Sequence, residues 1–381
     1  MSGLAIVLFL LAIASLAIFV YPFVVYPAIL SLLPRRALYA ATDTPPPRLT
    51  LVFCAYNEAK VLPAKIENLR RLKARHPDLE ILAYSDMSGD ATVEILQQAS
   101  DILTTVDATA RLGKAAGMRR LVELATGDVV IFTDANVLLA DDAIERLNAY
   151  FSDPTIGTVA GHLESTNEDQ GTTAGVGGRY WALEERIKAL ESRTGSTMGA
   201  DGSIFAIRRA LYPEVPPHLL DDLTASITPL FQGYRVVSAP DVVAYERLAT
   251  DRHDEYRRRR RIACRGFNTH RYLAPQLRRM GAFDQFKYVS HRVVRWFGPF
   301  FLSLAGLFGV LGLIAAIGLW WGLALCALGL VAFGLTWRAD RARSRQIWEI
   351  LVALFATGHG ILEALGGKTY QTWAPAESRN G

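Results

Sequence analysis

The stretch GDVVIFTDANVLLA, residues 127–140, indicates how this chain folds. Its four consecutive apolar residues, Val129–Phe132, are typical of a strand that is buried on both faces of a sheet. Asp134 and Asn136 follow where that strand ends, and in an α/β sheet this end faces the ligand. Two oxygen ligands placed there can hold a hard divalent cation. Taken alone, the two residues are as simply explained by a turn into the next helix.

Strand and helix patterns alternate along residues 48–163. The predicted strands are Arg48–Cys54, Glu80–Tyr84, Ile102–Thr105, Val129–Phe132 and Thr155–Leu163. The predicted helices are Val61–Arg75, a segment ending at Gln98, Met118–Ala125, Arg179–Arg193 and a segment from Leu219 to Gly233, with loops at Arg111–Gly117 and at the glycine-rich Gly171–Gly178. The alternation predicts an α/β domain built on a parallel sheet.

Carboxylates lie at three predicted strand ends. Glu58 follows the first strand, Asp86 and Asp90 follow the second, and Asp134 follows the fourth. Because the carboxyl ends of parallel strands meet at one edge of the sheet, we expect these groups to share a binding site. Asp86 and Asp90 also fit an Asx turn before a helix N-cap, and the two roles are compatible.

Two uncharged stretches predict membrane spans. Leu4–Leu33 exceeds the roughly 20 residues that cross a bilayer, and no Lys or Arg precedes it, which favours one spanning helix over a cleaved signal peptide. Trp296–Trp337 is about twice one span, with Gly318 at the expected turn. Basic residues at the ends of all three spans predict that the intervening region is cytoplasmic, at a cell (inner) membrane.

The segment Ile347–Leu365 is apolar but contains Glu349, His359 and Glu363. Charged groups are costly in hydrocarbon, so we expect an interfacial or re-entrant helix, with a fourth span as the alternative. The predicted organisation is a transmembrane helix (1–34), a linker (35–47), a cytoplasmic domain (48–271), a basic interfacial segment (272–295), a two-helix transmembrane hairpin (296–337) and an interfacial helix with a tail (338–381).

The charge balance indicates a membrane partner and argues against nucleic acid. The formal net charge is only +4, and the basic residues concentrate beside the apolar segments, where anionic lipid explains them. The three cysteines, Cys54, Cys264 and Cys326, fall in a strand, a basic segment and a span. They indicate neither a disulfide framework nor a metal site.

Six motifs occur in the order seen in family 2 glycosyltransferases, and the chain resembles the membrane-embedded polysaccharide-synthase branch. They are Ala55-Tyr56-Asn57-Glu58, Ser85–Thr92, Arg111-Leu112-Gly113-Lys114, Thr133-Asp134-Ala135-Asn136, Gly199–Arg209 and Asp221-Asp222-Leu223. The resemblance spans roughly residues 48–271. It implies a GT-A fold, which is a Rossmann-like α/β domain that binds a nucleotide sugar, with transmembrane helices on both sides.

The resemblance also implies how the donor is bound. Asn57, Glu58 and Asp86 would contact the uracil and ribose of a UDP-sugar, because carboxylates accept hydrogen bonds from imide and hydroxyl groups. Lys114 would approach the diphosphate. Asp134 and Asn136 would hold the metal, Mg²⁺ or Mn²⁺, although Asn136 stands where the family often has a second Asp, so one negative charge is lost.

The resemblance implies further roles in the sugar pocket, in proton removal and at the diphosphate. Asp201 would bind sugar hydroxyls, with a plain tight turn as the alternative. Asp222, next to Asp221, would be the general base of an inverting displacement, while the helix dipole offers a structural explanation for both. Arg258 and Arg261 match an arginine motif for the diphosphate, with Ile262 in place of its tryptophan, and the run Arg257–Arg261 also suits lipid headgroups. Trp373 matches a tail motif or serves as an interfacial anchor.

The predicted activity is metal-dependent transfer from a UDP-sugar to a growing glycan or lipid-linked acceptor. One alternative is a single-transfer glycolipid synthase with a ceramide- or polyprenyl-phosphate-type acceptor. Another, from a different class, is a non-catalytic membrane protein that binds nucleotide sugars.

Overall fold

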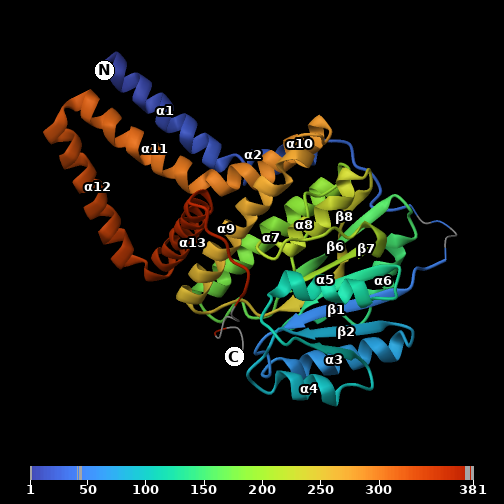
Figure 1. The fold of residues 1–381 in the computed structure, drawn as a ribbon. Coiled ribbons are helices and arrows are strands. Elements are labelled where there is room, and N and C mark those ends of the chain that lie inside the picture. The colour runs from blue at the N-terminus through green and yellow to red at the C-terminus, as the bar shows by residue number, and fades with distance from the viewer. Residues whose placement is uncertain (1, 41, 43–44, 374–377, 379–381) are drawn as a thin grey trace.

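The computed structural model describes residues 2–40, 42, 45–373 and 378. Figure 1 shows an α/β domain at one end and a group of long helices at the other, with the described end of the chain returning to the domain between them. Parts of the predicted linker (residues 41, 43 and 44) and of the predicted tail (374–377 and 379–381) lie outside the described residues.

The described residues form one eight-stranded sheet of order β3-β2-β1-β4-β7-β6-β8-β5. Its strands are β1 Leu49–Ala55, β2 Glu80–Ser85, β3 Thr104–Asp107, β4 Val129–Asp134, β5 Leu138–Leu139, β6 Ile156–Ser165, β7 Ile204–Arg208 and β8 Arg235–Glu246. The first four strands run parallel, but β7 is antiparallel to both β4 and β6. The predicted all-parallel sheet is therefore wrong in its second half. The antiparallel β7 starts at the edge where β4 ends, so the residues before β7 join that edge.

Strand β1 shows why the sheet is buried on both faces. Every residue of Leu49–Ala55 is buried. Leu51 and Phe53 pack on one face with α3 (Leu62–Arg75) and α6 (Ala143–Phe151), while Val52 and Cys54 pack on the other with α5 (Lys114–Leu124). Successive side chains of a strand point to opposite faces, so one apolar run serves two cores. Helix α4 (Thr92–Gln98) follows β2.

Helix α7 (Thr172–Arg193) occupies the place of the predicted glycine-rich loop. The expectation of a flexible loop over Gly171–Gly178 is wrong, because these glycines allow close packing. A Cβ on Gly178 would lie 2.3 Å from the Glu168 side chain, and one on Gly177 would lie 3.3 Å from Leu248. Helix α8 (Asp221–Phe231) follows β7 and ends before Gly233, near the predicted limits.

The N-terminal apolar stretch forms two helices, α1 (Gly3–Val20) and α2 (Val25–Leu32), whereas the sequence predicted one. Pro22 lies in the turn between them and lacks the amide hydrogen that a continuous helix needs. Helix α2 then packs on α7, where the Tyr26 hydroxyl donates a 2.6 Å hydrogen bond to Glu191.

Within the described part of the chain, four helices are long and apolar enough to cross a membrane by length and composition: Gly3–Val20, Ala282–Ile317, Leu319–Arg338 and Arg343–Leu365. The second comprises α10 (Ala282–Tyr288), a π-helical segment (Val289–Val293) and α11 (Val294–Ile317), and the others belong to α1, α12 (Leu319–Ala339) and α13 (Arg341–Leu365). The chain turns between α11 and α12 at Gly318, where φ is +89°. Helix α13 packs closely on α9 (Arg252–Leu277), since a Cβ on Gly360 would lie 2.3 Å from the Arg260 carbonyl oxygen.

Candidate functional site

A cavity of about 1080 Å³ lies where β1 and β4 end. Residues of α5, α7, α8, α9 and the C-terminal tail also line it, and it reaches side chains of the candidate membrane helices. Ligand pockets commonly measure about 300–1,000 Å³, so this one has room for a large ligand or for two ligands.

Three charged side chains converge beside Gly202. The Lys114 Nζ lies 2.5 Å from Asp134 Oδ1 and 3.8 Å from Asp221 Oδ2. A Cβ placed on Gly202 would lie 3.1 Å from Lys114 Nζ, 3.4 Å from Asp222 Oδ2 and 3.7 Å from Asp134 Oδ2. Glycine here keeps the space between the cation and the carboxylates open. Asp134, Lys114, Asp221 and Asp222, predicted from separate motifs, thus form one cluster, which we call the carboxylate cluster.

Asp222 is the member of the carboxylate cluster whose pKa is shifted toward neutral pH. Desolvation and the neighbouring charge of Asp221 raise its pKa to about 6, despite the opposing charge of Lys114. Its Oδ1 accepts a 2.7 Å hydrogen bond from the Leu223 amide at the start of α8. A carboxyl group with such a pKa can take a proton near neutral pH.

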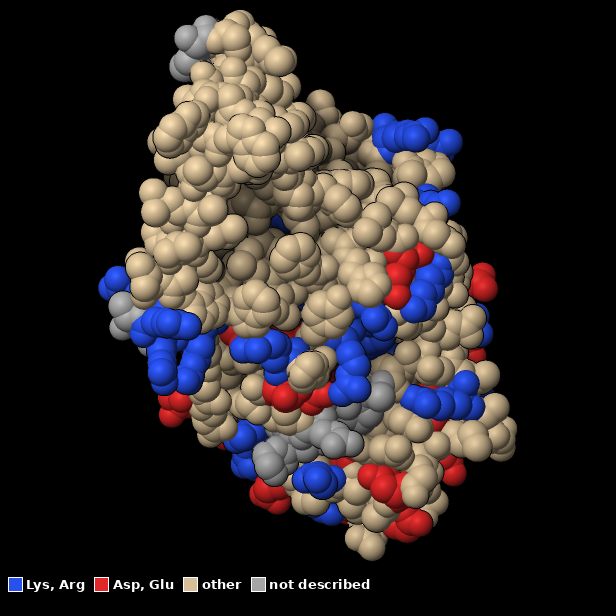
Figure 2. Space-filling view, turned by 90° about the vertical axis from the view of Figure 1, so that its left-hand side faces the viewer, with Lys and Arg blue, Asp and Glu red and all other residues tan. Residues whose placement is uncertain are grey.

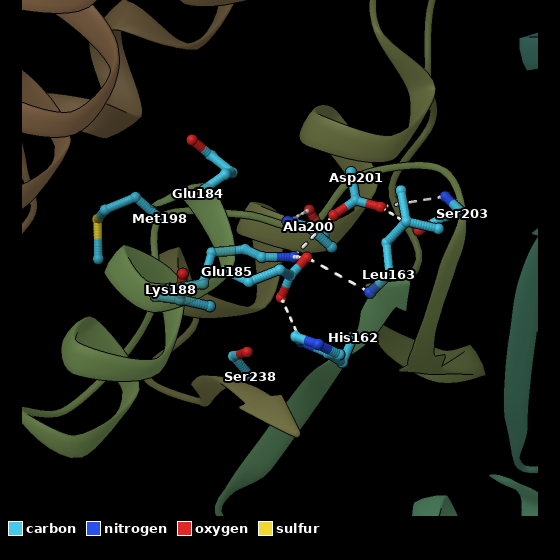
Figure 3. A network of polar contacts seen from close by, with 12 residues as sticks. His162, Leu163, Glu184, Glu185, Lys188, Met198, Ala200, Asp201, Ser203 and Ser238 are labelled. Carbon is cyan, nitrogen blue, oxygen red and sulfur yellow. Dashed lines mark hydrogen bonds and ion pairs between the residues drawn. The ribbon is translucent and has the colours of Figure 1, made fainter. Parts of the chain in front are cut away.

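Asp201 lines the same cavity but belongs to a different network, which Figure 3 shows from close by. The buried Lys188 Nζ lies 2.7 Å from Asp201 Oδ2 and 2.7 Å from Glu185 Oε1. Glu185 Oε2 in turn lies 3.2 Å from His162 Nδ1, and the Ser203 amide and hydroxyl donate to Asp201. Although burial opposes it, the Lys188 charge holds the pKa of Asp201 below its usual value.

The three predicted nucleotide contacts lie near β1 and β2 in different surroundings. Glu58 is buried and lines the cavity, while Asn57 and Asp86 do not line it. Asp86 accepts hydrogen bonds of 2.8 to 3.1 Å from the amides of Leu112 and Gly113, and Asn57 Oδ1 accepts one of 2.8 Å from the Gly89 amide. Both side chains hold the loops around the cavity, and their contact with a nucleotide stays a prediction.

The C-terminal tail reaches the carboxyl end of β1. The Trp373 ring lies 6.0 Å from the Tyr56 ring, edge to face, and the Trp373 carbonyl accepts a hydrogen bond from Arg111. Gly113 has φ +87°, and a Cβ on it would lie 2.2 Å from the Gln371 carbonyl oxygen. The tail motif is thus placed beside the predicted donor-binding loops.

The predicted arginines line the cavity from α9. Arg258 and Arg261 are both part of its wall. Arg258 lies 3.6 Å from Glu255, and the charges of Glu255, Glu246 and Asp134 raise its pKa despite burial. A positive group directed toward the carboxylate cluster suits a ligand with negative charge at that point.

The residues present fit a divalent metal ion. Asp134 and Asn136 both line the cavity, and the Asn136 Nδ2 donates a 3.1 Å hydrogen bond to Glu246, which orients the amide. Within the described residues no group of three or more His, Cys, Asp or Glu side chains is arranged to hold a metal. Mg²⁺ sites commonly use one or two carboxylates and take their other ligands from substrate phosphates and water, which this pair allows.

Sequence reasoning missed several residues of the cavity wall. Glu184, Lys188, Arg292 and Arg295 line it, together with Glu246 at the end of β8. They lie in a segment predicted to be an amphipathic core helix, in a basic segment next to a span, and on a strand that was not predicted. The one available signal was the position of Glu246 after the apolar run Val242–Tyr245, which resembles the other strand ends.

The chain is similar in sequence to several proteins named as bacterial glycosyltransferases. An N-acetylglucosaminyltransferase from Rhizobium sp. (strain N33) is 26% identical over 249 residues, which cover 62% of this chain and 54% of that protein. One from Rhizobium meliloti (strain 1021) is 24% identical over 230 residues, covering 57% and 53%. The O-antigen chain rhamnosyltransferase RfbN of Salmonella typhimurium is 25% identical over 207 residues, covering 51% and 65%. The chain spans about half the length of the two Rhizobium relatives.

A solved structure shares the whole architecture. The mannosyltransferase PcManGT from Pyrobaculum calidifontis, in complex with GDP-Man and Mn²⁺, superposes with a TM-score of 0.70 at 24% identity, covering 95% of this chain and 99% of that one. This likeness confirms the predicted GT-A fold. A model of the family described as glycosyltransferase like family 2 matches residues 46–266. Because that match covers more than half of the sequence, the chain belongs to glycosyltransferase family 2.

Proposed function

We propose that this protein is an inverting, metal-dependent glycosyltransferase that moves a sugar from a UDP-sugar to a glycan or lipid-linked acceptor. The observation that carries the proposal is the carboxylate cluster, in which Asp222 Oδ2 and Lys114 Nζ approach the same open point above Gly202. A cation and a carboxyl group of raised pKa at one point suit a reaction with an anionic leaving group and a proton to remove.

The donor half of the site is built on β1, β4 and α5. Glu58, which lines the cavity, would accept hydrogen bonds from the nucleoside, with Asn57 and Asp86 holding the adjoining loops. Lys114 and the α9 arginines Arg258 and Arg261 face the diphosphate. Asp134 and Asn136 would hold Mg²⁺ or Mn²⁺, which when bound neutralises charge that develops on the leaving diphosphate.

The acceptor half begins at α8. The oxygen of an acceptor hydroxyl attacks the anomeric carbon, the bond from that carbon to the diphosphate oxygen breaks, and the electron pair leaves with the nucleoside diphosphate. Asp222 takes the hydroxyl proton, and attack opposite the leaving group inverts the anomeric centre. Asp201, fixed by Lys188, accepts from a sugar hydroxyl, and Trp373 closes the site from the tail.

We further propose that the protein is a multi-pass membrane protein with its α/β domain on the cytoplasmic face. Four helices have the required length and composition, and basic residues flank them, including Arg35, Arg36, Arg338 and Arg345. Helix α13 packs along α9 at the cavity, which supports an interfacial or re-entrant position for it.

Nucleotide release from a panel of UDP- and GDP-sugars, measured with the full chain in membranes, tests the proposal. We expect release with one UDP-sugar in Mn²⁺ or Mg²⁺, and a loss of roughly 100-fold or more with EDTA, restored by added metal. Asp134→Asn should reproduce that loss, whereas Asp142→Asn, at an exposed pair with Arg146, should not. Binding of nucleotide sugars without release would instead favour the non-catalytic alternative, and full activity in EDTA would contradict metal dependence.

A further inference from the structure

The cavity continues from the carboxylate cluster to the candidate membrane helices. Phe19 of α1, Phe23 in the turn after it, Trp296 of α11 and Leu354 of α13 line its far part. Figure 2 shows a hollow on this side of the molecule, bordered by uncharged residues, with a basic side chain visible at its floor. The carboxylate cluster is thus joined to an apolar arm, which we call the membrane arm.

Between the cluster and the membrane arm, positive charge exceeds negative charge. Arg292 forms an ion pair with Glu184 at 3.5 Å, and Arg295 forms a shorter ion pair with the same carboxylate. Arg258 and Arg259 both pair with Glu255, at 3.6 and 2.5 Å. All four arginines line the cavity. Among the described residues, these ion pairs thus join two carboxylates to four guanidinium groups, with Glu246 and Asp134 acting on Arg258 from farther away, and the surplus of guanidinium groups suits an anion.

Two of these arginines meet at one aromatic ring. The Arg259 and Arg295 guanidinium carbons lie 5.0 and 5.2 Å from the centre of the Tyr180 ring, and Arg295 lies 5.5 Å from that of Phe23. Like charges that converge in a partly dry space repel unless an anion lies between them. Because Phe23 lines the membrane arm, its contact with Arg295 shows that this arginine lies where the arm becomes apolar.

The Arg295 guanidinium has a donor without an acceptor. Its side chain is 9% exposed, and among the described residues its Nη2 has no hydrogen-bond partner. The Nε of Arg265, whose side chain is 5% exposed and also lines the cavity, is in the same state. Buried donors are almost always satisfied in folded proteins, so unpaired ones in a cavity wall indicate a ligand with acceptor oxygens.

We propose that the acceptor is a saccharide joined through phosphate to a lipid, and that it enters through the membrane arm. This inference rests on the proposed function, because it places the acceptor hydroxyl at Asp222. The phosphate lies among Arg259, Arg292 and Arg295, and the hydrocarbon chain leaves past Phe19 and Phe23. The phosphate takes no covalent part, since only the hydroxyl oxygen forms a bond and only its proton is removed.

Each part of the arm selects against a simpler acceptor. A neutral glycan would leave the surplus arginines without an anion and the Arg295 donor unsatisfied, and a water-soluble sugar phosphate would leave the apolar wall without a partner. A lipid alone needs no route to the carboxylate cluster. The carboxylate cluster, the arginines and the membrane arm belong to one cavity. Together they specify an amphiphile whose phosphate lies between its saccharide and its lipid.

Direct binding to the full chain in phosphatidylcholine nanodiscs tests the inference with three probes. These are N-acetylglucosamine linked by a single phosphate to farnesol, the phosphate-free farnesyl glycoside of the same sugar, and N-acetylglucosamine 1-phosphate without lipid. We expect the first probe to bind roughly tenfold or more tightly than either of the others, because each lacks one recognised part.

Variants locate the phosphate. Arg295→Gln should weaken binding of the phosphate-linked probe by roughly tenfold or more and leave UDP binding unchanged. Arg259→Gln serves as a second variant in case the first fails to fold, since Glu255 keeps Arg258 as a partner. Arg343→Gln is the matched control, because this arginine lies on α13 outside the cavity wall with its side chain 84% exposed.

The outcomes separate the inference from the proposed function. Equal binding of the phosphate-free glycoside, or an equal effect of Arg343→Gln, would overturn phosphate recognition by these arginines. Equal binding of the lipid-free sugar phosphate would overturn entry of a lipid through the arm. Absence of nucleotide release from every donor would overturn the proposed function. The binding measurements with the three probes would still decide the acceptor class.

Discussion

Asp201 and Asp222 line the same cavity, yet their surroundings make them different chemical groups. Asp201 lies 2.7 Å from the buried Lys188 ammonium, and its pKa is below the usual value. Asp222 forms no ion pair within 4 Å among the described residues, and burial and Asp221 raise its pKa to about 6. The nearby cations are taken by other acids, since Lys114 pairs with Asp134 and Arg265 pairs with Asp221.

The difference shows that the position of a counter-ion decides the role of a carboxylate at a strand-end site. An acid with its own cation stays ionised and holds structure, whereas one that lacks a cation can lose and accept a proton near neutral pH. The Lys188 side chain reaches Asp201 from α7. Changing the charged neighbours of Asp201 and of Asp222 separately therefore tests this difference.

Removing the cation of Asp201 should have the largest effect on stability. Lys188→Met leaves Asp201 and Glu185 buried without their shared partner, so the free energy of unfolding should fall by about 3–5 kcal/mol. Chemical denaturation of the full chain in detergent measures it. Arg186→Met, at an exposed position of the same helix, is the control and should change stability by less than about 0.5 kcal/mol. Equal losses in both variants would show that the Lys188 pair is not structural.

Removing the charge next to Asp222 should move the pH dependence of transfer. In the wild-type protein, kcat/KM should rise as pH increases through about 6, because the base must lose its proton. Asp221→Asn removes a like charge that raises the pKa of Asp222, so the acidic limb should move to lower pH. A pH–rate profile of both proteins measures the shift, and an acidic limb that moves to higher pH would contradict the assignment.

The smallest effect is expected at the outer end of the Asp201 network. A hydrogen bond to Glu185 raises the pKa of His162 above its usual value. The charged imidazole therefore stabilises the fold below pH of about 6.5, and that contribution is lost as pH rises through the raised pKa. His162→Gln should lower stability by less than about 1 kcal/mol at pH 5.5 and leave it unchanged at pH 8.5. A larger loss at pH 8.5 than at pH 5.5 would contradict this.

The first half of the sheet could be predicted from the sequence because its strands are continuous apolar runs followed by polar turns. Val129–Phe132 has this pattern, as does Leu51–Cys54 within the predicted strand Arg48–Cys54, and both belong to central strands. The carboxylates after them, Glu58 and Asp134, accordingly line the cavity. Fold class and enzyme family followed from these residues together with the order of the motifs.

The second half could not be predicted in the same way. Strand β8 contains Pro240 and Asp241, which interrupt its apolar pattern, and the direction of the short β7 depends on packing between β4 and β6. The glycines that begin α7 were interpreted as flexible, although close contacts with Glu168 and Leu248 require them. The partner of Asp201 was likewise hidden, because no spacing in the sequence shows that Lys188 points into the cavity.

The most direct test of the central claim, that Asp222 is the general base, compares Asp222→Asn with the wild-type protein in single-turnover transfer and in UDP binding. We predict a rate lower by roughly 100- to 10,000-fold, with UDP affinity unchanged and no loss of stability, because the ionised carboxyl group is disfavoured by burial. Transfer at a rate close to that of the wild-type protein would contradict the claim.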